Sequence, residues 1–273
     1  MKISVISPVK NEVQFIGYSV MAVLPYIHEL IYNVARGTND GTVEILDYIQ
    51  KKYDTDGKIK WFFGDDFNVH DMPAYNKAFN DCIERSTGDA VWFLHPDMIV
   101  TNPEAIKTVK DGPLAWFTTL DSYAKDMETV ITKGRAARWK NIHAKKMGIH
   151  YFGGYGSQNE DFYHKAITGD AHAHFGELFS AYPFRVGDSG LRVNHYCELK
   201  PYKRRREKMA NCLKTLYPDS KGADMETMAA NHPRVTLEMS SGMFGQFDFE
   251  KKDVKIPSVF EKYKDEFEKV VSK

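Results

Sequence analysis

The first 117 residues alternate between short apolar runs and segments with helical periodicity, and this alternation constrains the fold more than any other feature of the chain. Strand patterns separated by helices of this length predict a parallel sheet built by right-handed crossovers. The apolar runs cover residues 3–7, 29–34, 58–63 and 90–94, and the helical patterns begin near residues 15, 41 and 72. We therefore expect an α/β fold with a central, mostly parallel sheet flanked by helices.

The apolar run at residues 90–94 has no polar interruption, which is typical of a strand covered on both faces. It is followed directly by His95, Pro96 and Asp97. In open α/β sheets, ligands bind in the crevice outside the carboxyl ends of the strands. A carboxylate placed there can hold a divalent metal, which in turn binds a pyrophosphate. Asp97 is therefore a candidate functional residue; the simpler alternative is that it only caps the next turn.

The composition of the 273 residues is ordinary for a globular protein, with 42% hydrophobic and 27% charged residues. Lysine plus arginine and aspartate plus glutamate both number 37, so the net charge of zero argues against a protein that binds polyanions over its whole surface. The three cysteines lack Cys-x-x-Cys spacing and predict neither a disulfide framework nor a zinc site. Because we find no membrane span and no convincing signal peptide, we expect a cytoplasmic protein.

The pattern becomes irregular after Pro113. Residues 114–200 are rich in glycine, histidine and aromatic residues, which suits loops and short strands around a site. Residues 203–206 are a run of four basic residues, which is either a solvated helix face or a segment that closes over phosphates. Residues 256–272 have the apolar stripe of an amphipathic helix. We divide the chain into a main domain, 1–200, with halves 1–117 and 118–200, and a C-terminal extension, 201–273.

Four motifs follow one another in the first half: Ser7-Pro8-Val9-Lys10-Asn11-Glu12, Gly37-Thr38-Asn39-Asp40-Gly41-Thr42, Ala74-Tyr75-Asn76-Lys77-Ala78 and Gly88-Asp89-Ala90. In this order and at this spacing they resemble motifs of the family-2 glycosyltransferases, which have the GT-A fold. The resemblance implies that residues 1–117 bind a nucleotide-activated sugar, usually a UDP-sugar. The residues that it and the basic run together suggest for donor binding are Pro8, Val9, Asn11, Glu12, Asp40, Asn76, His95 and Lys203.

The chain departs from the family pattern at two positions. The metal motif of the family is Asp-x-Asp, and here only its second acid remains, as Asp97, while His95 stands in place of the first. The resemblance still implies a Mn²⁺ or Mg²⁺ ion at Asp97, with a late histidine, His195, as a second ligand. The acid that commonly reads the uracil ring is replaced by Ala35, so we expect a smaller preference for uridine than is usual in the family.

The second half has a glycine loop at residues 153–156, followed by Glu160 and Asp161. These acids resemble the family's Glu-Asp pair, in which the aspartate is the general base of inverting enzymes; helix capping is the alternative reading. His172 and His174 compete with His195 for the role of metal ligand. A histidine is more often structural than metal-binding, so a purely structural role is the simpler interpretation of each of the three.

The function implied is the metal-dependent transfer of a sugar from a nucleotide-diphosphate sugar to an acceptor hydroxyl, with inversion. Two alternatives remain: a nucleotidyltransferase, and a non-catalytic protein that kept a nucleotide-sugar pocket. The first is disfavoured because the turn at residues 7–12 contains no glycine and so lacks a glycine-rich phosphate loop. The acceptor could be a glycan, a lipid-linked sugar, a protein, a small molecule or a modified nucleic-acid base.

Overall fold

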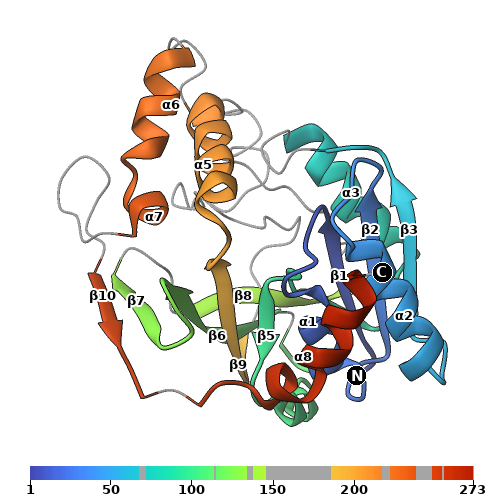
Figure 1. The fold of residues 1–273 in the computed structure, drawn as a ribbon. Helices are drawn as coiled ribbons and strands as arrows, with labels where there is room; N and C mark the ends of the chain where they lie inside the picture. The colour runs from blue at the N-terminus through green and yellow to red at the C-terminus, as the bar shows by residue number, and fades with distance from the viewer. Residues whose placement is uncertain are drawn as a thin grey trace.

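The structure of the chain is a computed structural model that describes residues 1–67, 72–113, 115–133, 138–145, 186–216, 222–237, 248–253 and 255–272. Within these residues ten strands form one sheet, and helices pack against it (Figure 1). The predicted α/β class, with a central sheet flanked by helices, is confirmed. No helix in these ranges is long and apolar enough to cross a membrane.

The first half of the chain forms the parallel part of the sheet, as the alternating pattern predicts. The strands are β1 (Ile3–Val9), β2 (Glu29–Ala35), β3 (Ile59–Gly64) and β4 (Ala90–Phe93), and they lie in the order β4-β1-β2-β3, all parallel. Between them run α1 (Ile16–Val23), α2 (Thr42–Tyr53) and α3 (Met72–Arg85). The chain order of strands and helices is therefore the one read from the sequence.

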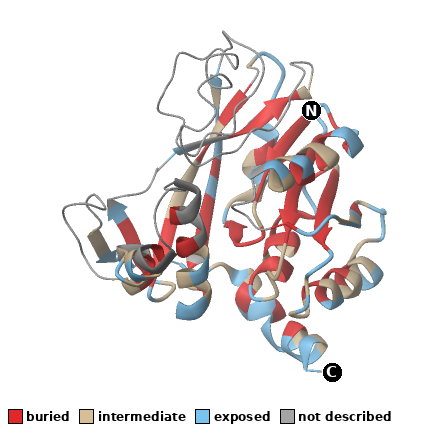
Figure 2. Cartoon of the chain, turned by 90° about the horizontal axis from the view of Figure 1, so that it is seen from above, coloured by how far each residue is buried: buried red, intermediate tan, exposed pale blue. Residues whose placement is uncertain are grey.

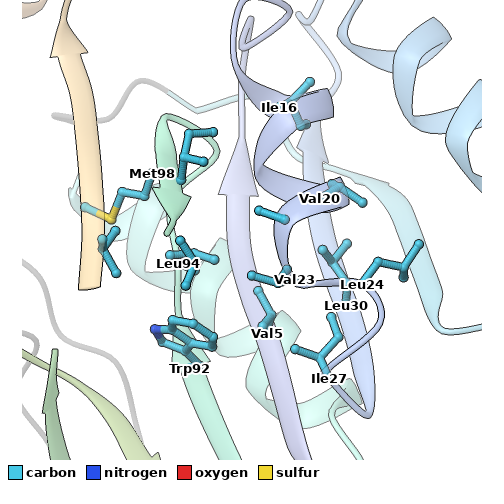
Figure 3. Close-up of a cluster of buried hydrophobic side chains, with 14 of the residues drawn as sticks. Val5, Ile16, Val20, Val23, Leu24, Ile27, Leu30, Trp92, Leu94 and Met98 are labelled. Carbon is cyan, nitrogen blue, oxygen red and sulfur yellow. The ribbon is translucent and has the colours of Figure 1, made fainter. Parts of the chain in front are cut away.

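Strands β1, β2 and β4 are buried along their whole length, because helices cover both faces of this part of the sheet (Figure 2). On one face, Val5 and Leu30 pack with Val20 and Val23 of α1 (Figure 3). On the other, Ile6, Ile31, Val91 and Phe93 pack with Phe79, Cys82 and Ile83 of α3. This double burial explains the uninterrupted apolar runs.

The next part of the chain adds strands that pair mostly antiparallel. They are β5 (Met98–Val100), β6 (Ala115–Ala124), β7 (Thr129–Lys133), β8 (Arg138–Ala144) and β9 (Val186–Glu198), and a 3₁₀ helix, η1 (Pro103–Thr108), follows β5. Strand β8 pairs with β4, and β6 lies between β8 and β7. The exception to the antiparallel pairing is that β6 and β9 run parallel to each other. The sequence predicted loops and short strands here, which is wrong for β6 and β9, with ten and thirteen residues. Their polar side chains obscure the strand pattern that burial would otherwise produce.

The C-terminal extension returns to the main sheet. Helices α5 (Tyr202–Leu216), α6 (Gly222–Ala230) and α7 (Pro233–Thr236) form a small apolar cluster of their own, and β10 (Asp248–Lys251) pairs with β7. The predicted terminal helix is present as α8 (Ser258–Val271), which lies against α1 and α2 (Figure 1). Phe267 of α8 packs on Gly17 of α1, where even a methyl group would come within 2.6 Å of the ring. The boundary between domains at residue 200 stays a prediction.

Candidate donor site

Asp97 and His195 lie side by side because β5 pairs with β9. After β4 the chain makes a turn in which the amide of Met98 donates to the carbonyl of His95. Strand β5 then runs antiparallel to β9, with Met98 opposite His195. The imidazole Nε2 of His195 lies 3.5 Å from Oδ1 of Asp97. The structure therefore brings together the two residues that the resemblance suggests as metal ligands, 98 positions apart in the chain.

A lysine ammonium joins Asp97 to a second carboxylate at the end of β1. Nζ of Lys200 lies 2.8 Å from Oδ2 of Asp97 and donates to Oε1 of Glu12, also at 2.8 Å. Arg204, in the first turn of α5, donates to the same Glu12 oxygen at 3.2 Å and to the carbonyl of Lys10 at 3.0 Å. We call Glu12, Asp97, His195, Lys200 and Arg204 the central cluster.

The central cluster is a set of buried charges that compensate one another. The side chains of Lys200 and Asp97 are 5% and 6% exposed, and that of Glu12 is 14% exposed. Burial alone would raise the pKa of Asp97, but Lys200 and His195 outweigh it and hold this pKa well below its usual range. Burial lowers the pKa of Lys200, but Asp97 and Glu12 together raise it by more. The ammonium therefore stays charged. Burial dominates at Glu12, whose pKa is raised.

As they stand in this structure, these residues do not fit a divalent metal. Both oxygens of Asp97 already face a partner, one of which is a cation. In the described ranges no group of three or more histidine, cysteine, aspartate and glutamate side chains could hold a metal ion. An ammonium about 4 Å from a divalent ion would be repelled by on the order of 8 kcal/mol at an effective dielectric constant of about 20. A metal at Asp97 would therefore have to displace Lys200.

The turn after β1 is tied to the start of α2 by the polar residues of two of the sequence motifs. Pro8 and Val9 end β1 and are buried. Asn11, with a positive φ of 55°, accepts a hydrogen bond from the amide of Asn39 at 2.9 Å. Asp40 accepts from the amides of Val13 and Thr42, both at 3.1 Å. Both oxygens of Asp40 thus hold the backbone of this turn in place. Contact of Asp40 with a nucleoside stays a prediction and is additional to this structural role.

The remaining predicted donor residues, His95, Asn76 and Lys203, lie on different parts of the chain. His95 is half-buried, its ring lies edge-on to Phe79 at 5.9 Å between centroids, and burial lowers its pKa to about 4. A neutral imidazole at this position can accept as well as donate a hydrogen bond. Asn76 lies in α3, and Lys203 is exposed in α5. Their roles in donor binding stay predictions.

The basic run at residues 203–206 is not simply a solvated helix face. Arg204 belongs to the central cluster, and Arg206 lies 3.4 Å from Glu226 of α6. Arg205 donates to the carbonyl of Val235 at 2.9 Å and to that of Lys200. The guanidinium of Arg205 therefore fastens α5 to the chain that carries Lys200.

Sequence reasoning missed a second charged pair at the same edge of the sheet. Asp66 follows β3, and its Oδ1 lies 2.8 Å from Nζ of Lys10, which also donates to the carbonyl of Phe67 at 2.9 Å. The hydrogen bond from Lys10 lowers the pKa of Asp66 against a smaller effect of burial, and the amide of Gly37 contributes as well. The signal was present in the sequence, because an acid that directly follows a parallel strand lies at the ligand-binding edge.

Several predicted residues lie outside the described residues. These are the glycine loop 153–156, the proposed catalytic pair Glu160 and Asp161, and the competing histidines His172 and His174. Among the described candidates for the metal ligand, His195 is the histidine beside Asp97.

Comparisons with known proteins give structural matches only. No protein-family model and no curated protein sequence matches the chain significantly. A fragment of Staphylococcus aureus TarS in complex with UDP matches with 15% identity and a TM-score of 0.43, over 84% of this chain and 70% of that one. Glucosyl-3-phosphoglycerate synthase from Mycobacterium tuberculosis, in complex with Mn²⁺, UDP and phosphoglyceric acid, matches with 15% identity and a TM-score of 0.42, over 78% of each chain.

A mycobacterial protein matches with 12% identity and a TM-score of 0.44, over 94% of this chain and 87% of that one. At this level of identity and TM-score the likeness concerns the course of the chain and not the residues of the site.

Proposed function

We propose that this chain is a glycosyltransferase with a GT-A fold, which moves a sugar from a nucleotide-diphosphate sugar, a UDP-sugar by the resemblance, to an acceptor hydroxyl. The observation that carries the proposal is the central cluster, where Lys200 and Arg204 lie beside Asp97 and Glu12 at the carboxyl ends of β4 and β1. Ligands of open α/β sheets bind at this edge. Cationic side chains there match the charge of a diphosphate.

The nucleoside and the diphosphate of the donor each have a proposed counterpart among the residues of the site. The nucleoside lies in this proposal along the turn after β1, with Asn11, Asp40 and Asp66 as its polar contacts. The diphosphate lies near Lys200 and Arg204, which bind and orient it and offset the negative charge that grows on the leaving group. The exposed Lys203 of α5 supplies a further phosphate contact from solvent.

The catalytic step needs a base that removes the proton of the acceptor hydroxyl as this oxygen attacks the anomeric carbon. We assign this role to Asp161, with Glu160 as a neighbour that binds acceptor or sugar. A single displacement of this kind inverts the anomeric centre. The metal ion that the resemblance implies at Asp97 and His195 enters no step of this mechanism. A cytoplasmic location also stays a prediction.

Nucleotide binding is the first test, because it does not depend on knowing the acceptor. Calorimetry should detect binding of UDP or GDP to the purified chain. Arg204→Met should weaken that binding about tenfold or more, as expected for the loss of a charged hydrogen bond. Arg138→Met is the matched control, since Arg138 is an exposed arginine whose ion pair with Asp188 lies on β8 and β9, away from the central cluster.

A screen of labelled nucleotide sugars for hydrolysis and transfer then tests catalysis. Release of free sugar or its transfer to an acceptor supports the proposal. Binding without turnover of any donor would identify a non-catalytic nucleotide-sugar-binding protein. Release of pyrophosphate from a nucleoside triphosphate would instead identify a nucleotidyltransferase. Failure to bind any nucleoside diphosphate would refute the proposal altogether.

A further inference from the structure

Lys200 occupies a position between two carboxylates at which a cation is required. Its Nζ atom lies 2.8 Å from an oxygen of Asp97 and 2.8 Å from an oxygen of Glu12. All three side chains are largely buried. Two carboxylates buried this close together repel each other unless a positive charge lies between them. In the described residues, the ammonium of Lys200 is the charge that touches both.

The ammonium group has a hydrogen-bond donor left over for a ligand. A lysine ammonium carries three N–H groups. The two described acceptors are Oδ2 of Asp97 and Oε1 of Glu12. No other described residue accepts a hydrogen bond from this ammonium, so within the described part of the chain its third N–H can donate to an oxygen of a ligand. A phosphate oxygen is the natural acceptor, because hydrogen bonds between charged groups are the strongest that side chains make.

Other positive groups converge on the same place. Arg204 touches Glu12, and Lys208, one turn further along α5, acts on Asp97 and His95 through its charge. Positions 204 and 208 lie on one side of the helix because they are four residues apart. Lys200, which precedes the helix, contacts the same oxygen of Glu12 as Arg204. Together, Lys200, Arg204 and Lys208 place positive charge at fixed positions in the site, as a bound divalent ion would.

We propose that Lys200 is the built-in cation of this donor site, so that a nucleoside diphosphate binds to it without a metal ion. The proposal rests on the donor-binding function proposed above. In this proposal, Asp97 binds the ammonium of Lys200 and fixes its position. It does not act as a metal ligand.

The experiment measures the affinity of UDP by calorimetry in EDTA and in saturating Mn²⁺. For the wild type we expect dissociation constants that agree within about threefold in the two conditions. Lys200→Met should weaken UDP binding in EDTA about tenfold or more, because it removes a charged hydrogen bond. Binding of uridine, which has no phosphate, should not change in this variant. Lys51→Met is the control, since Lys51 is an exposed lysine of α2 paired with Asp47.

Mn²⁺ gives the variant a second readout. Without the ammonium, the negative charges of Asp97 and Glu12 are no longer offset, so Mn²⁺ bound to the diphosphate should restore part of the UDP affinity of Lys200→Met. Thermal unfolding checks that the variant folds, and Lys200→Arg, which keeps the charge, should retain more affinity than Lys200→Met. The wild-type comparison of EDTA with Mn²⁺ needs no variant and is decisive if both variants fail to fold.

The outcomes separate this inference from the proposed function. Binding of UDP by the wild type only when Mn²⁺ is present would overturn the inference and leave the glycosyltransferase proposal standing. Unchanged affinity of Lys200→Met in EDTA would overturn it too. Absence of binding of any nucleoside diphosphate in both conditions would remove the proposed function and this inference with it.

Discussion

Replacing Glu29 with glutamine should destabilise the fold by an amount that depends on pH. Glu29 begins β2, and its side chain is 2% exposed. One carboxylate oxygen accepts from the hydroxyl of Ser4 at 2.6 Å and from the amide and hydroxyl of Thr87, and the other lies 2.6 Å from Nζ of Lys60. The carboxylate thereby joins β1, β2, β3 and the turn before β4.

The size of the effect follows from the pKa of this carboxyl group. Burial alone would raise the pKa of Glu29, but the hydrogen bonds from Lys60, Ser4 and Thr87 outweigh it and lower the pKa from its ordinary 4.5 to about 2. A pKa that is lower in the folded state stabilises the fold above pH 4.5 and loses this contribution as the pH falls toward 2. The contribution at neutral pH is about 3 kcal/mol, of which about 2 kcal/mol is lost by about pH 3.

Urea unfolding of the wild type and of Glu29→Gln at neutral pH and near pH 3 measures this directly. The difference in unfolding free energy between the two proteins should shrink by about 2 kcal/mol on acidification. Lys60→Met is the partial control, since it removes the ammonium and leaves Ser4 and Thr87 in place, so its difference from the wild type should shrink by less. A difference between wild type and Glu29→Gln that is the same at both pH values would refute the reasoning.

Three further predictions concern the packing of α8, the catalytic base and the choice of nucleotide. Gly17→Ala should lower the unfolding free energy by about 1–3 kcal/mol, measured by urea unfolding, because the new methyl group meets the ring of Phe267; unchanged stability would mean that α8 shifts freely. Asp161→Asn should slow sugar transfer about a hundredfold or more and spare donor binding, as expected for a lost general base, and near-normal turnover would contradict that role. With Ala35 in place of the usual acid, calorimetry should show only a modest preference for UDP over GDP, and Asp66→Asn should alter that preference; a strong preference that survives this change would show that another residue reads the base.

The sequence by itself determined the parallel half of the fold and the edge at which the site lies. Apolar runs covered on both faces and intervening helical periodicity are local patterns, so β1, β2 and β4 and their helices could be read from the chain, including α3 at residues 72–85. Asp97 was recognisable because it directly follows a buried strand. The long strands β6 and β9 were less visible, because their polar residues weaken the apolar pattern.

Only the tertiary structure decided which charged groups meet at that edge. Asp97 reaches His195 and Lys200 through the pairing of β5 with β9, and Glu12 reaches the same ammonium from the end of β1. No local pattern encodes these partners, since strand pairing between distant segments depends on the packing of the whole sheet. A buried charge needs a partner of opposite sign within a few ångströms, and the fold determines whether that partner is a metal ion or, as here, the ammonium of Lys200.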